Sequence, residues 1–347
     1  MMKNYPKVFA ITLLAVASMF GPAYARELTA RSVCIMDGDR ILYAKNPTMK
    51  QPPASTTKLI TAMVAIDSLP LDKVITISGN AASVGAALRE GDRFTVRQVL
   101  NLALIKSING AAVALAEAVS GSEDDFSQLM NKKAESIGAH DTHYINASGL
   151  PGKGQYITAY DLALIMQKAL EYPLIAEIIG IRNKTITSQD GRSVHVSNTN
   201  KLLWSDKDLL GGKTGYTNAA RHCLAFAAER GDTTLVAAIL GDSSRKDLWR
   251  SAEKVLDRGY DIVINDKESV IITSENDVAP KAKVRRISSA KKAKKVSHLT
   301  GHGSKSKHKK YGKAVGKTKK ASVASARKHH HRLEAERRTA RSKVRSL

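Results

Sequence analysis

The stretch PASTTKLITAMV (residues 53–64) places a lysine where an apolar helix would begin. Ser55 stands three residues before Lys58, and the residues that follow Lys58 are mostly apolar. Helical spacing puts such a pair on one face, so the hydroxyl and the amine are predicted to be neighbours. Lysine is among the side chains least often buried. The stretch therefore indicates either a lysine that reaches solvent or an amine whose desolvated environment serves chemistry.

The N-terminus has the pattern of an export signal. Lys3 and Lys7 supply a basic start, residues 8–20 are apolar, and AYA at 23–25 fits a small-x-small cleavage site. The apolar run is short for a membrane span. We expect residues 1–25 to be a signal peptide, and the mature chain to be a peripheral protein of the periplasm or cell surface with no transmembrane segment.

The basic residues are concentrated at the C-terminal end. The chain has 55 Lys and Arg against 32 Asp and Glu, a net charge of +23. Residues 281–347 hold 24 of the basic residues and two acidic ones, so residues 1–280 are nearly neutral. This tail has too few large apolar residues for a core, and we expect it to be disordered.

Two interpretations of the tail are open: a solvated spacer, or a tether to an anionic polymer or lipid of the cell envelope. The export signal argues against nucleic acid, the usual partner of such a segment. HHH at 329–331 is interpreted as part of the solvated basic run. No metal or cofactor is expected.

Strand patterns lie at both ends of the neutral region, with helix patterns between them. Residues 32–45 read as two strands joined through Asp-Gly, and a second hairpin with Asp-Gly lies in residues 184–196. LLGGKTGYT, HCLAFAAE and TLVAAILG predict three further strands, and a closing helix follows in residues 243–260. We expect one α+β unit whose terminal strands share a sheet and whose middle forms a helical lobe.

Three short motifs stand in a consistent order. S-x-x-K alone is a weak signal, because it occurs eight times in the chain. Ser55/Lys58 opens a predicted helix, Ser107-Ile-Asn109 lies between two helical segments, and Lys213-Thr-Gly lies in a predicted strand. The combination of order, spacing and context is far more specific than any one motif.

This set resembles the signature of the penicillin-recognising serine enzymes. The chain is similar, over residues 28–262, to the D-alanyl-D-alanine carboxypeptidases (low-molecular-weight penicillin-binding proteins), with further support from AAVALAEAVSGS, NASGLPGKGQYITAYDLALI and GGKTGYTNAA. The resemblance implies a β-lactamase/D,D-peptidase-like fold, with an antiparallel five-stranded sheet flanked by helices plus a helical lobe. The catalytic domain is then expected at 26–263, with a linker at 264–280.

The resemblance implies catalytic roles for Ser55, Lys58 and Ser107. A serine hydroxyl is a poor nucleophile until a neighbouring group takes its proton. A desolvated Lys58 with Lys213 nearby would be pushed towards its neutral form, and Ser55 at a helix N-terminus would face the positive end of the dipole. Ser107 would relay a proton to the departing amine.

Substrate binding is assigned, again by resemblance, to Asn109, Lys213, Thr214, Gly215 and Tyr216. Asn109 would hold the substrate amide, and Lys213 with Thr214 would bind the carboxylate of a terminal D-alanine. Gly215 would let the substrate lie along the strand as a β partner. The backbone amides of Ser55 and Tyr216 would form the oxyanion hole.

The sequence departs from the family pattern near the expected cleft. Ile108 stands where a small residue is usual, Gly110 where an acidic or amide residue is common, and Arg221 where a glycine usually ends an AAG sequence. None of these removes a catalytic group. About twenty residues separate the closing helix from the basic tail, so we expect neither the β-rich second domain nor the membrane anchor of many relatives.

The two cysteines are expected to be free thiols. In the implied fold the first strand pairs with the last, and the strand of Cys223 lies one further across from that of Cys34. Two strand spacings are about 10 Å, beyond the roughly 7 Å over which a disulfide can join two Cα atoms.

The leading functional interpretation is a serine D,D-carboxypeptidase that trims peptidoglycan stem peptides through an acyl-enzyme on Ser55 and binds β-lactam antibiotics covalently. A D,D-endopeptidase that cuts cross-bridges with the same residues is the main alternative. A β-lactamase is disfavoured, because no E-x-x-L-N pattern lies between Asn109 and Lys213. A non-enzymatic cationic wall-binding protein is disfavoured, because all the catalytic side chains are present.

Overall fold

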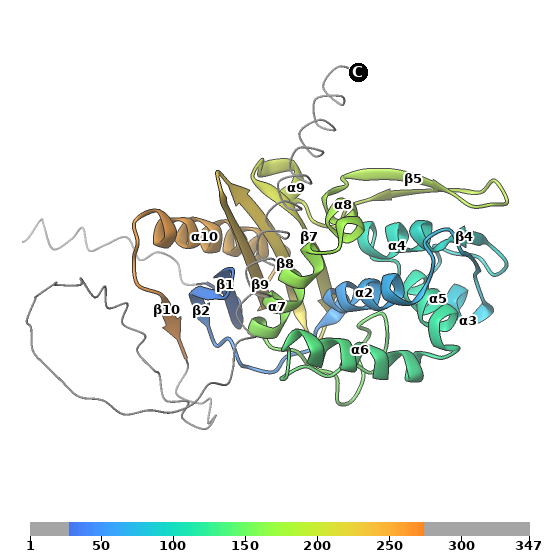
Figure 1. The fold of residues 1–347 in the computed structure, drawn as a ribbon, viewed down its shortest axis with the longest axis horizontal. Helices are drawn as coiled ribbons and strands as arrows, with labels where there is room; N and C mark the ends of the chain where they lie inside the picture. Colours follow the sequence, from blue (N-terminus) through green and yellow to red (C-terminus); the bar gives the residue numbers. More distant parts are fainter. Residues whose placement is uncertain (1–27, 274–347) are drawn as a thin grey trace, which may run out of the picture. The chain divides into compact units, whose positions relative to one another are not determined.

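A computed structural model describes residues 28–273 of the chain. The predicted signal peptide and the predicted disordered tail lie outside these residues. β1 (Ser32–Asp37) and β2 (Arg40–Lys45) form the hairpin that Asp-Gly indicated. These two strands are the first elements of the described chain (Figure 1).

The main sheet joins the two ends of the described chain. β7 (Leu209–Thr217), β8 (Arg221–Arg230) and β9 (Thr233–Asp242) run antiparallel in sequence, and β9 pairs antiparallel with β1. These strands and β2 are the predicted antiparallel five. Within residues 28–273 the sheet has a sixth strand, β10 (Val270–Ile272), which pairs in parallel with β2 and makes the order β10-β2-β1-β9-β8-β7.

The extra strand lies in the segment that the sequence suggested as a linker. It has three residues, all of them exposed, so it shows neither the length nor the alternation that identify a strand from sequence. Its parallel pairing follows from the closing helix, α10 (Arg245–Ile264), which returns the chain across the sheet before β10. The sheet therefore has one short edge strand more than the five strands that the resemblance implied.

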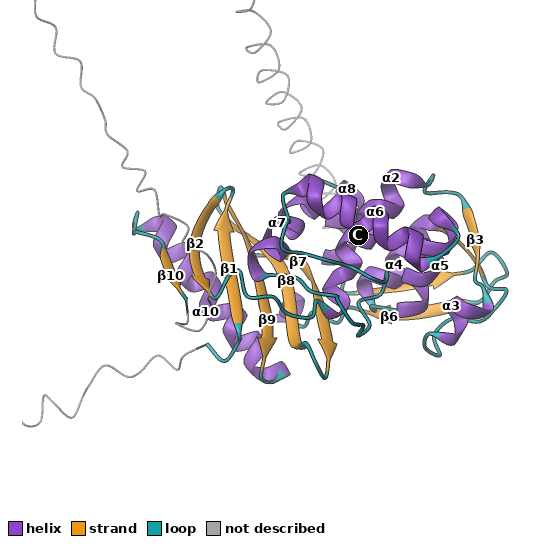
Figure 2. Cartoon of the chain, turned by 90° about the horizontal axis from the view of Figure 1, so that it is seen from below, coloured by secondary structure: helices purple, strands orange, loops and turns teal. Residues whose placement is uncertain are grey.

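Helices cover both faces of the sheet (Figures 1 and 2). On one face, Leu248, Val255 and other apolar residues of α10 pack in a core with alternate residues of β1, β8 and β9. On the other face, α7 (Ala159–Leu170) packs Leu162 and Ile165 against the remaining alternate residues. This alternation buries both sides of β1, β8 and β9, which is why those strands read as nearly continuous apolar runs.

The helical lobe is arranged around α2 (Lys58–Ser68), whose first eight residues are all buried. α4 (Val96–Ile105), α5 (Asn109–Ser120), α6 (Glu123–Ile137), α7 and α8 (Pro173–Gly180) contact it. Side-chain caps fix where several helices start: Thr95 caps α4 in a full capping box, and Ser122 caps α6. The N-terminus of α2 is directed towards the sheet, at β7.

Short elements complete the described part. The second predicted hairpin is confirmed as β5 (Asn183–Thr187) and β6 (Ser193–Ser197). The apolar spacing of FTVRQVLNLALIK (residues 94–106) predicts a helix over the whole stretch, but its first two residues belong to β4 (Arg93–Thr95), which pairs with β3 (Val74–Thr76). The helix starts later because Thr95 is its N-cap, and an N-cap residue has extended rather than helical backbone. Two further short helices are α3 (Gly79–Ser83) and α9 (Leu202–Ser205).

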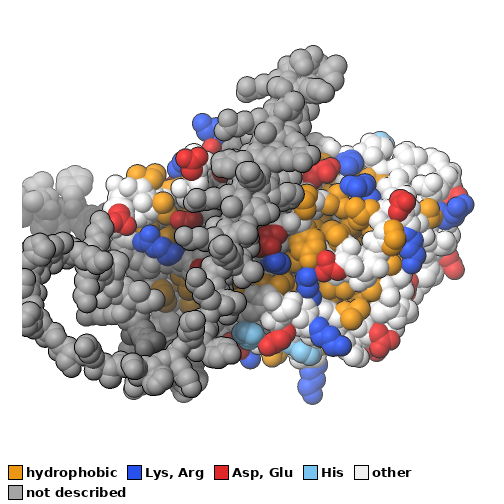
Figure 3. Space-filling view, viewed as in Figure 1, with side chains coloured by type: hydrophobic (Ala, Val, Ile, Leu, Met, Phe, Trp, Pro, Cys, Tyr) orange, Lys and Arg blue, Asp and Glu red, His pale blue; other side chains and the backbone are white. Residues whose placement is uncertain are grey.

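The surface and the cysteines agree with the sequence-based picture. Acidic and basic side chains are interspersed on the visible face of the described part (Figure 3), as its near-neutral charge predicts. Across residues 28–273, none of the helices has the length and apolar character needed to cross a membrane. Cys34 and Cys223 are buried and form no disulfide, and β9 lies between their strands, which confirms the prediction of two thiols.

Candidate active site

Ser55 lies in a tight turn that leads into α2. The turn is a 3-10 helix, η1 (Ala54–Thr57), and the α-helix begins at Lys58. The predicted helix thus opens with a 3-10 turn, as helices often do. Ala54 has a φ of 48°, in the left-handed region that non-glycine residues seldom adopt. The backbone directly before the hydroxyl is therefore held in a strained conformation of the kind found at functional sites.

Lys58 is fully buried, and its amine contacts the serine. Its Nζ donates to Ser55 Oγ at 3.0 Å, to Asn109 Oδ1 at 2.8 Å and to the Ser148 carbonyl at 2.6 Å. These acceptors are all uncharged, so they do not compensate a buried positive charge. Burial is the main cause that lowers the pKa of Lys58 well below its ordinary value, Lys213 lowers it further, and Glu123 acts in the opposite direction.

Ser107 and Lys213 form a second hydroxyl–amine pair. Lys213 Nζ donates to Ser107 Oγ at 2.8 Å and to the Thr214 carbonyl at 2.8 Å. Lys213 is fully buried, and burial lowers its pKa to about 7. Ser107 has a φ of 65°, a second strained residue at this site. Each serine hydroxyl is thus within hydrogen-bond distance of a desolvated amine.

The edge strand β7 lies directly beside the nucleophile turn. A Cβ added to Gly215 would lie 3.0 Å from both the Ser55 backbone nitrogen and the Ala54 Cβ, so the glycine permits this close approach. Thr214 Oγ1 donates to Thr199 Oγ1 at 2.6 Å. The Tyr216 side chain is 52 % exposed and lies against the ring of His222, with centroids 4.5 Å apart.

A cleft opens over Ser55 and runs along β7 towards the start of α10. It is lined by Ser55, Ser107, Thr199, Thr214, Gly215, Tyr216, His222, Arg245, Leu248 and Trp249. Lys58 adjoins the cleft through its hydrogen bond to Ser55, and Lys213 through its hydrogen bond to Ser107. Asn109 accepts a hydrogen bond from Lys58. All eight residues singled out from the sequence therefore lie together.

The sequence profile of the D-alanyl-D-alanine carboxypeptidase family matches residues 19–244 of this chain. The chain belongs to this family. The resemblance that was stated on the three motifs is thus confirmed over most of the catalytic domain. The chain is a serine D,D-peptidase.

Curated members of the family are similar over most of their length. The D-alanyl-D-alanine carboxypeptidase DacF of Bacillus subtilis is 32% identical over 267 residues, which are 74% of this chain and 68% of that protein. A D-alanyl-D-alanine endopeptidase of Pseudomonas aeruginosa is 36% identical over 210 residues, 58% of this chain and 67% of that protein. Both names occur among relatives, so family membership covers both reactions.

Solved structures of the family share the fold. The D-alanyl-D-alanine carboxypeptidase from Mycobacterium tuberculosis H37Rv is 32% identical, with a TM-score of 0.64 over 69% of this chain and 95% of that one. The Streptomyces K15 DD-transpeptidase is 29% identical, with the same TM-score of 0.64 over 67% of this chain and 98% of that one.

Two departures from the family pattern have local structural reasons. A Cβ on Gly110 would lie 2.2 Å from the Ala81 carbonyl oxygen, so the close packing of α3 on α5 requires glycine there. Arg221, which replaces the usual glycine, has a φ of 59°. The turn between β7 and β8 therefore keeps the left-handed backbone that a glycine would adopt freely. Ile108 is buried, at 8 % exposure, and the structure gives no further account of it.

Several residues of the site were not found from the sequence. Ser148 contributes a backbone carbonyl, which every residue type offers, so no motif marks it. His222 reaches the cleft from β8, opposite Tyr216, and Thr199, Arg245, Leu248 and Trp249 reach it from segments that carry none of the three motifs. In residues 28–273 no group of three or more His, Cys, Asp or Glu could hold a metal ion.

Proposed function

We propose that the chain removes the terminal D-alanine from peptidoglycan stem peptides through an acyl-enzyme on Ser55. The observation that carries this proposal is the contact of 3.0 Å between Ser55 Oγ and the fully buried Lys58 amine. A hydroxyl needs a base near its working pH, and desolvation gives an amine that property.

The hydrogen bonds of Lys58 direct its lone pair. A neutral amine has two N–H groups and one lone pair, whereas the ammonium has three N–H groups. Asn109 Oδ1 and the Ser148 carbonyl can accept the two N–H groups of the neutral amine. The lone pair is then left facing Ser55 Oγ, which is the arrangement that proton removal requires.

The reaction follows from this geometry. Ser55 Oγ attacks the carbonyl of the penultimate D-alanine while Lys58 takes its proton, and the developing oxyanion is bound by the backbone amides of Ser55 and Tyr216. The C–N bond then breaks, and the departing D-alanine amine receives a proton through Ser107 from Lys213. Water then attacks the ester carbonyl, and one of its protons returns to Lys213. As the ester C–O bond breaks, Lys58 gives its proton back to Ser55 Oγ, which restores the free serine and both amines.

Substrate binding is assigned to the groups along β7 and α5. The terminal carboxylate binds Lys213 and Thr214, with Arg245 adding positive charge in the same cleft. Asn109 binds the substrate amide, and Gly215 lets the peptide backbone lie along the strand edge. β-Lactams enter the same site and acylate Ser55.

Covalent labelling tests the nucleophile, and product analysis tests the reaction. Fluorescent penicillin is expected to label the wild-type protein and not Ser55→Ala, with Ser243→Ala as the matched control outside the motif set. Free D-alanine is expected from a stem pentapeptide. Failure of the wild type to bind penicillin would favour a non-enzymatic wall-binding protein.

The alternative is a D,D-endopeptidase, favoured by the 36% identity to the Pseudomonas aeruginosa endopeptidase. Cross-linked muropeptide dimer and pentapeptide should be supplied in parallel at equal concentration. Faster release of D-alanine than of monomer supports the carboxypeptidase assignment, and the opposite order supports the endopeptidase.

Location and the basic tail belong to the same proposal. The export pattern of residues 1–25 supports a protein that acts in the periplasm or at the cell surface. The excess of positive charge in residues 281–347 supports electrostatic attachment to an anionic envelope polymer or lipid. Full-length protein should sediment with envelopes at low salt and not at high salt, and a 1–280 variant should not sediment. Equal, salt-independent behaviour of the two would contradict the attachment.

A further inference from the structure

A short loop after α6 lies beneath the nucleophile turn. We call residues 146–150 (NASGL) the strap. Its conformation is fixed by its own side chain: Asn146 Oδ1 accepts from the Gly149 backbone N–H at 2.7 Å, and Asn146 Nδ2 donates to the Leu150 carbonyl at 2.9 Å. A Cβ on Gly149 would lie 1.9 Å from the Ala54 carbonyl oxygen, so the strap is in direct contact with the turn that carries Ser55.

The strap is bonded to α2 at two successive carbonyls. The Ser148 carbonyl accepts from Lys58 Nζ at 2.6 Å, and the Ala147 carbonyl accepts from Thr61 Oγ1 at 2.7 Å. Lys58 and Thr61 are one helical turn apart and both are fully buried. A displacement of the strap would therefore move an acceptor that orients the Lys58 amine.

Helix α6 holds the strap from the other side. In its first turn, Glu123 Oε1 accepts from the Ala147 backbone N–H at 2.9 Å. Two turns later, Asn131 donates to the Tyr144 carbonyl at 2.8 Å and accepts from the Tyr144 N–H at 2.7 Å. Both side chains restrain the segment that leads to Ser148, but only Glu123 of the two carries a charge.

The charged groups that act on Lys58 come from two elements. Lys213 on β7 disfavours a second positive charge, and Glu123 on α6 favours it. Burial remains the largest influence on the pKa of Lys58. The neighbouring contacts of the amine, Ser55, Asn109 and the strap, are neutral.

We propose that Glu123 is a positioning residue of the D,D-peptidase site, which fixes the strap against Lys58 and supplies the negative charge that counters Lys213. Through the Ala147 N–H it orients the acceptor of the Lys58 amine, and its charge partly offsets the effects of burial and Lys213 on that amine. This inference rests on the proposed role of Lys58 as the base in acylation.

Glu123→Gln separates the two contributions. Glutamine retains an oxygen acceptor for the Ala147 N–H but removes the charge. The second-order rate of acylation by fluorescent penicillin should be measured from pH 5 to pH 9. The acid limb is expected to move to lower pH by roughly half a unit, because Lys58 loses its proton more readily, while the plateau stays within about twofold.

Glu123→Ala and Asn131→Ala complete the design. Glu123→Ala also removes the acceptor, so its plateau rate is expected to fall roughly tenfold. Asn131→Ala loosens the same segment without changing charge, so thermal stability should fall while the acid limb stays at the wild-type pH.

Each outcome has a defined meaning. A Glu123→Gln profile that coincides with the wild-type profile overturns the inference, as does an equal shift of the limb in Asn131→Ala. Absence of labelling in the wild type would instead overturn the proposed function itself, so the two failures are distinguishable.

Discussion

The two ends of α2 use lysine in opposite ways. At the N-terminal end, Lys58 is fully buried among neutral oxygen acceptors, and its pKa is lowered. At the C-terminal end, Lys133 of α6 donates to Asp67 Oδ2 at 2.7 Å, and its side chain is 21% exposed. Burial acts to lower the pKa of Lys133, but its interactions with Asp67 and Tyr172 outweigh burial and raise it.

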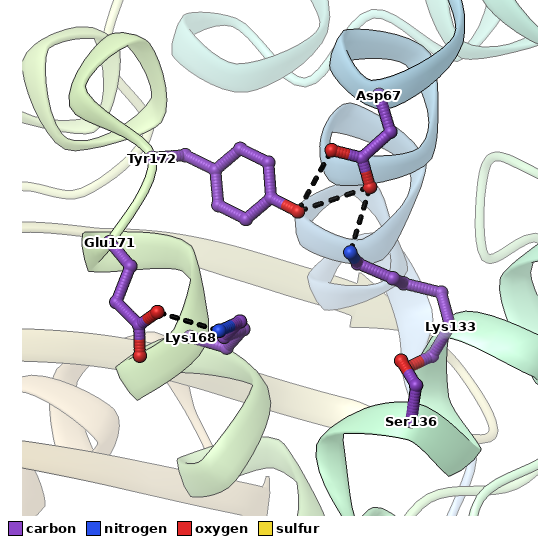
Figure 4. Close-up of polar contacts among 6 residues, drawn as sticks. All are labelled: Asp67, Lys133, Ser136, Lys168, Glu171 and Tyr172. Carbon is purple, nitrogen blue, oxygen red and sulfur yellow. Dashed lines mark hydrogen bonds and ion pairs between the residues drawn. The ribbon is translucent and has the colours of Figure 1, made fainter. Parts of the chain in front are cut away.

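Figure 4 shows the second arrangement. Asp67 of α2 lies between the Lys133 amine and the Tyr172 hydroxyl, which donates to both carboxylate oxygens at 3.0 and 3.1 Å. The neighbouring Lys168–Glu171 pair, at 2.6 Å, is also a surface ion pair. A carboxylate partner and access to water keep an amine charged, whereas neutral partners in a dry site do not. The comparison predicts chemistry at one end of α2 and modest stabilisation at the other.

The largest effect should come from Lys58→Met. Penicillin acylation is expected to fall by about a thousandfold or more, because the hydroxyl loses its base. The free energy of unfolding at pH 7 is expected to change by no more than about 1 kcal/mol, because methionine removes the desolvation cost of the amine and also its hydrogen bonds to Asn109 and Ser148. Stopped-flow labelling and thermal melts measure the two effects.

Lys133→Met is the matched control at the other end of the helix. It should leave acylation within about twofold of the wild type and lower stability by about 1 kcal/mol or less, since the ion pair is partly exposed. Loss of acylation in both variants would contradict the comparison.

The pH profile should show the two buried amines acting in opposite directions. Acylation should fall about tenfold per unit as pH drops below the lowered pKa of Lys58, because the base becomes protonated. Binding of the substrate carboxylate should weaken above about pH 7, because Lys213 then loses its charge. KM for a pentapeptide should therefore rise on the alkaline side, and kcat should fall there as well, because Lys213 also supplies the proton that reaches the departing amine through Ser107.

A profile that is flat from pH 5 to pH 9 would contradict this assignment. Lys213→Arg supplies the control, because an arginine stays charged throughout this range. Its KM should lose the alkaline rise, whatever the change in absolute affinity.

The reacting pairs could be predicted from sequence because their chemistry is local or marked by side-chain type. Ser55 and Lys58 are one turn apart in any helix, and the motifs of Ser107 and Lys213 are recognisable once their order is considered. The sheet order was implied by the family resemblance, and the structure confirms it for all five expected strands.

The remainder depends on contacts that sequence spacing does not encode. Ser148 acts through a backbone carbonyl 90 residues from Lys58, and Thr199 meets Thr214 from a loop of its own. Asp67 and Lys133 are 66 residues apart and carry no motif. β10 is too short to show a period. In each case tertiary packing, rather than local pattern, brings the groups together.

A smaller effect is expected from Asp67→Ala. It removes the acceptor of both Lys133 and the Tyr172 hydroxyl, and should lower the free energy of unfolding by about 1 kcal/mol, since the carboxylate is partly exposed. Because the pair is exposed to salt, the difference from wild type should shrink in 1 M NaCl, a concentration at which the Debye length is about 3 Å. A loss that is unchanged by salt would show that packing, not charge, stabilises this end.

The smallest effect should come from Tyr172→Phe, which removes one hydroxyl and leaves the Asp67–Lys133 pair in place. A net loss of about 0.5 kcal/mol is expected, insensitive to salt because no charge is removed. Acylation should be unchanged. The buried residues of α2 hold the helix in place between this cluster and Lys58, so the loss of one surface hydrogen bond should not move Lys58. A reproducible change in the acid limb of this variant would show that the exposed end of α2 is coupled to the base, and the two ends could then no longer be treated as independent.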